Sequence, residues 1–225
     1  NGFYAVAKSY ILYRQKRAEL RAARTTLTDA VDAPGLDECL AEILQAFEGP
    51  EYSLTVLSGK FSSFLKSGMP RQEALGALVK AAVELTTQQA PKWEFIAARL
   101  LNYKFELELQ AELERRGIHT FYEKLRYLTD EGLYGTYILE RYSREELEQA
   151  ASFLRPERNA LFTYAGLDLQ LKRYVIHTHQ RVPLETPQEM YLGIALHLAM
   201  EEKQDRLGWV QRFYDMLSKM EVTMA

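Results

Sequence analysis

Residues 184–199 read LETPQEMYLGIALHLA, a marked helix start followed by a helix with little polar surface. Thr186 suits the N-cap position, Pro187 the first helical position, and Glu189 the position three residues after the cap, which together make a capping box. Beyond Glu189 almost every position is apolar. Because such a helix needs cover on most of its sides, we expect it at the centre of a helical bundle or beneath another domain.

Helical periodicity continues along most of the chain. Residues 173–185, RYVIHTHQRVPLE, are the one stretch with an extended pattern, and they predict a small hairpin. We therefore expect an all-α fold, a multi-helix orthogonal bundle with at most one small β-hairpin. Further helices are expected at residues 3–24, 36–48, 52–66, 70–85, 91–116, 120–132, 143–154 and 164–171.

The composition limits the classes of protein to which the chain can belong. Its 225 residues are 47% hydrophobic, enough for one sizeable core or two smaller ones, and the formal net charge is −3. This charge argues against binding nucleic acid with the whole surface, and every apolar run is shorter than the roughly 20 residues that span a bilayer. No secretion signal is recognisable and Cys39 is the single cysteine. We expect a cytoplasmic protein without nucleic-acid or membrane partners.

Recognisable catalytic chemistry is sparse. His177 and His179 share one side of the extended stretch, but no further histidine or cysteine lies nearby in the sequence to complete a site, so we expect no metal. No histidine has a glutamate three residues before it, which excludes a di-iron helical bundle. His197, inside the apolar helix, is expected to be a hydrogen-bonded core residue. A phosphate-binding loop, a nucleophile elbow and a zinc-protease motif are all missing, so no catalytic residue is assigned.

The first expected helix is strongly basic. Four of its arginines recur at helical spacing and share one face, where guanidinium groups could bind a phosphate or an acidic partner surface. A solvated basic face is the alternative, because charge runs usually mean no more than that. Against the single acidic residue Glu19, this helix carries Lys8, Arg14, Lys16, Arg17, Arg21 and Arg24.

Three stretches together resemble the N-terminal region of the large, catalytic alpha subunit of class I ribonucleotide reductases. Residues 90–106, APKWEFIAARLLNYKFE, resemble the last helix of the ATP-cone region in that family. Residues 157–200, which contain the opening stretch, resemble the second half of its N-terminal helical domain. Residues 206–225, RLGWVQRFYDMLSKMEVTMA, resemble the helix and the strand, here EVTMA, that enter the catalytic barrel. The order and spacing match over about residues 54–225.

The resemblance implies three parts. Residues 1–26 are similar to the closing helix of an upstream ATP cone, residues 27–110 to a reduced, cone-like helical unit, and residues 111–225 to the helical domain that leads into a barrel encoded downstream. Arg14, Lys16 and Arg17 stand where a cone meets the phosphates of ATP, which makes them candidate remnants of a nucleotide site. Leu107 and Arg71 stand where complete cones have a lysine and a threonine, so we expect the reduced cone not to bind ATP.

The resemblance also implies a function. The full-length enzyme would be an oxidoreductase that reduces ribonucleotides to deoxyribonucleotides by thiyl-radical chemistry, supplying DNA replication, with ATP and dATP as allosteric effectors. Its catalytic cysteines would lie downstream, so this fragment is expected to be inactive alone and to hold no cofactor. The expected partners are the small, radical-generating beta subunit and other large subunits. The alternative is a stand-alone α-helical interaction module that docks an acidic partner through its basic first helix.

Overall fold

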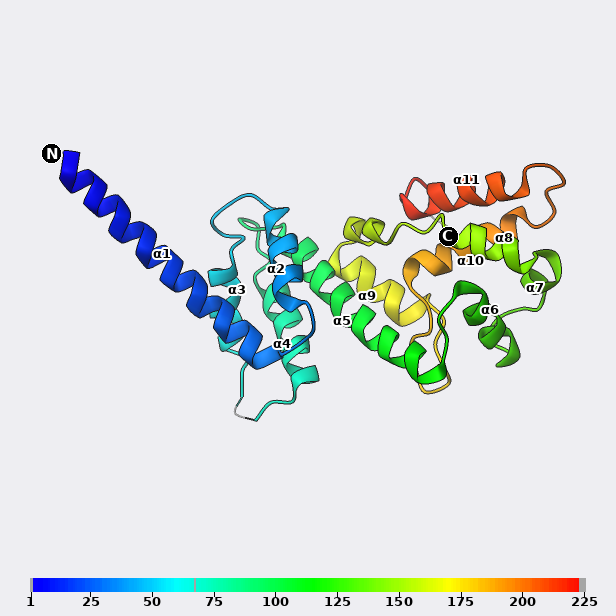
Figure 1. Cartoon of the computed structure of the whole chain (residues 1–225), viewed down its shortest axis with the longest axis horizontal. Helices are drawn as coiled ribbons and strands as arrows, with labels where there is room; N and C mark the ends of the chain where they lie inside the picture. The colour runs from blue at the N-terminus through cyan, green and yellow to red at the C-terminus, as the bar shows by residue number, and fades with distance from the viewer. Residues whose placement is uncertain (1, 67, 223–225) are drawn as a thin grey trace. The chain divides into compact units, whose positions relative to one another are not determined.

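The structure is a computed structural model that describes residues 2–66 and 68–222. Over this range it is all-α and contains no strand, as the sequence predicts (Figure 1). Residues 223–225, most of the predicted strand EVTMA, lie outside the described residues. The elements are α1 (Gly2–Val31), α2 (Leu36–Gln45), α3 (Leu54–Ser62), α4 (Arg71–Glu84), α5 (Trp93–Arg116), α6 (Phe121–Asp130), α7 (Tyr137–Arg141), α8 (Arg144–Ala151), the 3-10 helix η1 (Pro156–Leu161), α9 (Tyr164–Arg173), α10 (Pro187–Ala199) and α11 (Arg206–Ser218).

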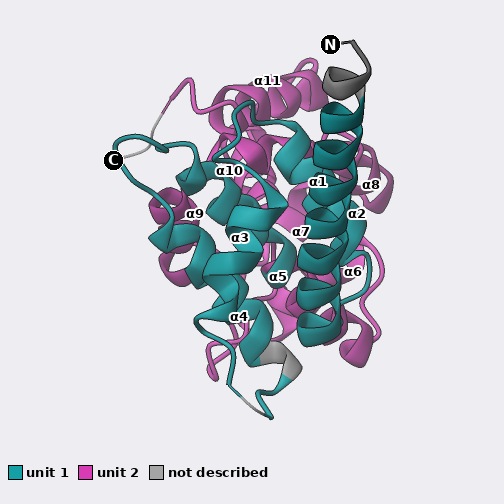
Figure 2. Cartoon of the chain, turned by 90° about the vertical axis from the view of Figure 1, so that its left-hand side faces the viewer, with its two compact units in different colours: residues 1–104 teal, residues 105–225 magenta. Residues whose placement is uncertain are grey.

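The chain divides into two compact units, residues 1–104 and residues 105–225 (Figure 2). The first unit holds α1 to α4 and the start of α5, and the second holds the rest. Among the described residues, each helix is too short or too polar to span a membrane.

The core of the first unit lies where α1 packs on α3 and α4. Leu27 and Val31 of α1 are buried there, with Phe61 of α3 and Leu78 of α4. The helix α1 runs past Arg24, where the predicted helix ends. Burial of Leu27 and Val31 outweighs the low helix propensity of the threonine and aspartate residues around them, so the helix continues to Val31.

The front of α1 is exposed. Every side chain from residue 7 to residue 22 is exposed, and Ala23 is the first buried one among those described. Tyr10, Ile11, Leu12 and Tyr13 are each more than half exposed. Four consecutive helical residues point in different directions, so this part of α1 presents apolar surface around most of its circumference.

The core of the second unit is built by α6, α8, α10 and α11, with α10 packed most extensively on α11. Leu192, Leu196 and Val210 are fully buried in it, and the ring of Tyr214 lies beside them. Capping boxes begin three of the helices, at Thr120, Ser143 and Thr186, each with a glutamate three residues later. The box at Thr186 is predicted by the sequence and confirmed.

The extended stretch before α10 makes a minimal hairpin. His177 and Pro183 form an isolated antiparallel bridge. The N–H of Thr178 donates to the carbonyl of Val182 at 2.8 Å, and Arg181 turns the chain with a φ of 65°. The prediction of at most one small hairpin is therefore confirmed for the described residues, and the hairpin delivers Glu185 to the start of α10.

Candidate functional site

Helix α10 has one buried face and one open face. The buried face consists of Leu192, Ala195, Leu196 and Ala199, which are all fully buried. On the opposite side His197 is exposed and Leu198 is 48% exposed. Within the described residues α10 has apolar cover on one side only. The prediction that His197 is a core residue is wrong, because its side chain is exposed. The apolar sequence of α10 shows that several of its sides could be buried, but it does not show which side packs on the rest of the chain.

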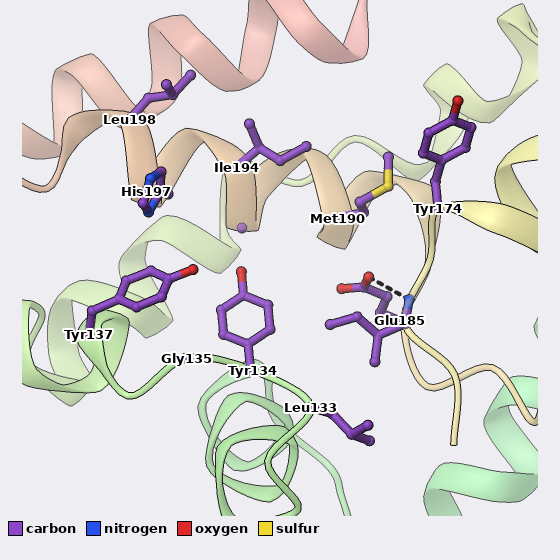
Figure 3. A pocket seen from close by; sticks show the side chains of 12 residues that line it. Leu133, Tyr134, Gly135, Tyr137, Tyr174, Glu185, Met190, Ile194, His197 and Leu198 are labelled. Atoms are coloured by element: carbon purple, nitrogen blue, oxygen red, sulfur yellow. Dashed lines mark hydrogen bonds between the residues drawn. The ribbon is translucent and has the colours of Figure 1, made fainter. Parts of the chain in front are cut away.

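The open face of α10 forms one wall of a pocket of about 510 Å³. Tyr134, from the segment that joins α6 to α7, and Tyr137, the first residue of α7, face it. Glu185 lies beside the Tyr134 ring, below Met190 (Figure 3). The ring of His197 meets the ring of Tyr137 edge-on, with 5.1 Å between the ring centres. The walls are thus largely aromatic and apolar, with a carboxyl group at one end.

Gly193 makes room for Tyr134. The Tyr134 hydroxyl points toward α10 and comes so close to Gly193 that a Cβ at this position would clash with it (Figure 3). A glycine inside a helix costs about 1 kcal/mol relative to alanine. The close approach of Tyr134 gives a physical reason for glycine in the middle of an otherwise well-formed helix. Burial raises the pKa of the Tyr134 hydroxyl above its usual range, so this group remains a proton donor at neutral pH.

Glu185 is the buried acidic group of the pocket. Its side chain belongs to a residue that is only 5% exposed, and its Oε1 accepts a hydrogen bond of 2.8 Å from the Ile176 N–H. Burial raises the pKa of the Glu185 carboxyl to about 8; the Ile176 N–H and Lys124 lower it, and the charge of Glu189 raises it. The backbone of the hairpin thus holds the carboxyl, and Glu185 itself directly precedes the N-cap residue Thr186 of α10.

Lys124 of α6, which is 6% exposed, is engaged by a different carboxylate. Its Nζ lies 2.6 and 2.7 Å from the two carboxylate oxygens of Glu189. Oε2 of Glu189 also accepts from the Thr186 N–H at 2.8 Å, which completes the capping box. One glutamate therefore both starts α10 and neutralises a buried cation from a helix 65 residues away in sequence.

The three residues predicted as remnants of a phosphate site lie on the exposed part of α1. Lys16 is exposed, the Arg14 guanidinium lies 6.0 Å from the centre of the Tyr10 ring, and the Arg17 guanidinium lies 5.6 Å from that of Tyr13. These contacts connect each arginine with its own helix. The structure does not gather Arg14, Lys16 and Arg17 around one cavity.

Of the four arginines predicted to share a face, three line a groove between α1 and α2. This groove has a volume of about 620 Å³ and is lined by Arg17, Arg21 and Arg24 with apolar residues of α2. Arg24 also forms a salt bridge of 3.1 Å with Asp37 of α2. Arg14 does not line the groove.

His177 and His179 are the histidine pair considered as a possible metal site. His177 lies in the hairpin opposite Pro183. Within the part of the chain that the structure describes, no cluster of three or more histidine, cysteine or acidic side chains could hold a metal ion.

Comparison with known proteins identifies the second unit. Residues 160–225 match the family described as "Ribonucleotide reductase, all-alpha domain". The ribonucleoside-diphosphate reductase subunit alpha of Treponema pallidum (strain Nichols) is 54% identical over 218 residues, 97% of this chain and 26% of that protein. The subunit alpha of Chlamydia trachomatis serovar D is 31% identical over 252 residues, 100% of this chain and 23% of that protein. The chain belongs to the ribonucleotide reductase alpha-subunit family. The subunit alpha of Enterobacteria phage T4 is 29% identical over 181 residues, 80% of this chain and 24% of that protein.

The chain spans about a quarter of the length of the curated relatives it matches. The family match includes α9, α10 and α11, and with them Glu185 and one wall of the pocket. Sequence reasoning missed Glu185, Lys124 and Tyr134 as site residues. Glu185 directly precedes the N-cap residue Thr186, which the sequence shows, but its burial depends on tertiary packing. Lys124 and Tyr134 carry no such local signal.

Proposed function

We propose that this chain is an N-terminal regulatory and structural segment of a ribonucleotide reductase large subunit, which in its longer form reduces ribonucleotides to deoxyribonucleotides. The observation that carries this proposal is the similarity to reductase alpha subunits over nearly the whole chain, together with the all-alpha domain match at residues 160–225. Thiyl-radical reduction requires several cysteines, and this chain has Cys39 alone. The chemistry is therefore assigned to residues beyond this segment.

The proposed division of the segment follows the family resemblance. Residues 1–26 close an upstream ATP cone, residues 27–110 form a reduced cone, and residues 111–225 form the helical domain next to the barrel. The exposed apolar run at residues 10–13 supports the first assignment, because a helix that packs into a preceding module needs such surface.

Regulation and partners complete the proposal. ATP and dATP act as allosteric effectors at the upstream cone, with Arg14, Lys16 and Arg17 as remnants of its phosphate contacts. The working partners are the small, radical-generating beta subunit and other large subunits in the cytoplasm. The absence of a common cavity for the three basic residues is consistent with a phosphate site that needs elements outside this chain.

The decisive experiment is an activity assay with the longer protein. The large subunit that contains this segment, mixed with its small subunit, should convert CDP to dCDP, and the 225-residue chain in place of that large subunit should give no product. Failure of the complete pair to reduce any ribonucleoside diphosphate, with the small subunit's radical present, would overturn the proposal.

Nucleotide binding is tested separately by calorimetry with dATP on the 225-residue chain. We expect no measurable heat, because the reduced cone has Leu107 and Arg71 where complete cones have a lysine and a threonine. Tight binding would contradict the assignment of residues 27–110 as a cone that has lost its nucleotide site, while leaving the reductase assignment in place.

A further inference from the structure

The pocket beside α10 contains a buried carboxyl group that lacks a counter-ion. Glu185 lines the cavity, and only 5% of this residue is exposed. The nearest buried cation, Lys124, holds both carboxylate oxygens of Glu189. Among the described residues no salt bridge reaches Glu185, and the Ile176 N–H donates to its Oε1. A buried carboxyl without a cation is costly to ionise, so a cation that enters the pocket supplies what the fold does not.

The rest of the pocket suits the apolar part of a guest. Tyr134, Tyr137 and His197 present aromatic rings, and Met190 and Ile194 present apolar side chains from α10 (Figure 3). Aromatic rings attract cations over their faces and accept flat apolar groups beside them. The volume of about 510 Å³ lies in the range of small-molecule sites.

We propose that this pocket binds a small organic cation, an ammonium or amidinium group on a flat apolar ring, with Glu185 as the anchor and Tyr134, Tyr137 and His197 as the walls. Anions are disfavoured because the Glu185 carboxyl lies at this end of the pocket and the charge of Glu189 acts on it in the same sense. Neutral rings of the same shape gain the apolar contacts but leave the carboxyl without a counter-ion. This proposal concerns a site within the second unit and does not depend on the reductase assignment.

Binding is measured at pH 9, where the carboxyl is ionised. Burial raises the pKa of Glu185 to about 8, so at pH 7 a cation has to displace a proton. Three groups face or influence this carboxyl: the hydroxyl of Tyr134 before α7, the ammonium of Lys124 on α6, and the carboxylate of Glu189 on α10. Tyr137 and His197 lie further along the pocket. The Tyr134 pKa is raised by burial, so this hydroxyl stays protonated at pH 9.

The test titrates the 225-residue chain with benzamidine and monitors binding by the amide chemical shifts of the chain. We expect saturable shifts at Ile176, Gly193 and His197 with a Kd of about 1 mM or below. Benzamide, the neutral analogue, and benzoate, the anionic one, should each bind at least tenfold more weakly. Glu185→Gln keeps an oxygen that can accept from the Ile176 N–H, and it should weaken benzamidine at least tenfold.

The matched control is Glu201→Gln, which removes an exposed carboxylate of the same unit outside the pocket and should leave the benzamidine affinity unchanged. Tyr174→Ala removes a 58% exposed wall of the pocket and should weaken benzamidine about threefold. Shifts that stay the same in Glu185→Gln, equal binding of benzamide, or no shift at 10-fold the expected Kd would each overturn the proposal. Proper folding of Glu185→Gln is checked by its unshifted amide spectrum outside the pocket.

Discussion

The two units of this chain hold their helices in different ways. In the second unit, capping boxes begin α6, α8 and α10, and a buried ion pair connects α6 with α10. In the first unit, α2 and α4 begin at Gly35 and Pro70 without a side-chain cap, and apolar packing of α1 on α3 and α4 supplies the core. Apolar contacts tolerate many arrangements, whereas paired polar groups allow few. The difference indicates that the second unit specifies its helix arrangement more tightly than the first.

The largest effect is expected at the buried ion pair of the second unit. Lys124→Met leaves the Glu189 carboxylate at a largely buried position without its cation, and such a loss costs about 3–5 kcal/mol of the free energy of unfolding. Urea unfolding followed by circular dichroism measures this change. Lys172→Met is the matched control, because Lys172 pairs with Asp168 on the surface of α9 and should contribute less than about 0.5 kcal/mol. Similar losses in both variants would mean that polar contacts do not distinguish the second unit.

The corresponding change in the first unit concerns an apolar side chain. Leu27→Ala removes a fully buried group where α1 meets α3 and α4, with an expected cost of about 2–5 kcal/mol. Leu12→Ala on the same helix removes a side chain that is 55% exposed and should change the free energy of unfolding by less than about 0.5 kcal/mol. Hydrogen exchange of α3 and α4 amides reports the effect within this unit. If Leu12→Ala destabilised the chain as much as Leu27→Ala, the exposed front of α1 would have to pack on something within the chain.

A pH dependence is expected from Glu185. Burial raises its pKa to about 8 from an ordinary value of 4.5, so between these pH values the unfolded chain loses the proton more readily than the folded one. The free energy of unfolding therefore falls as pH rises through this window, by at most about 1.4 kcal/mol per pH unit, and levels off above pH 8. Glu185→Gln lacks this contribution, so its stability relative to the wild type should rise from pH 5 to pH 8. Urea unfolding at several pH values measures this difference. Glu201→Gln is the control, because its stability relative to the wild type should not change with pH in this window.

Local patterns made much of the fold predictable from the sequence. The boxes at Ser143 and Thr186 and the helix end at Gly117, with its φ of 68°, involve residues within a few positions of one another, so the sequence displays them directly. The same reasoning applies to the small hairpin. The box at Thr120 follows the same spacing with Glu123.

Long-range contacts were not predictable in the same way. The partner of Lys124 lies 65 residues further along the chain, and nothing near Lys124 in sequence indicates that it is buried. The end of α1 and the open face of α10 depend on which surfaces pack together, and periodicity gives an apolar stripe without its partner. The sequence predicts that the four arginines of the first helix share a face, which their helical spacing ensures. The groove that Arg17, Arg21 and Arg24 line also depends on α2, whose position a helical pattern does not give.

The smallest expected effect compares one cap from each unit. Thr186→Ala removes the side chain that accepts from the Glu189 N–H at 3.1 Å, and the loss of an N-cap costs about 1 kcal/mol. Ser53→Ala removes a longer contact of 3.4 Å to the Val56 N–H, which has no reciprocal glutamate, so the expected cost is about 0.5 kcal/mol or less. Hydrogen exchange of the first amides of α10 and α3 measures each loss in its own unit.

Because Glu189 also pairs with Lys124, loosening the Thr186 cap should weaken that ion pair, and a double-mutant cycle of Thr186→Ala with Lys124→Met should be non-additive. Additive losses would show that helix start and ion pair act independently, and the second unit would then be no more tightly specified than the first.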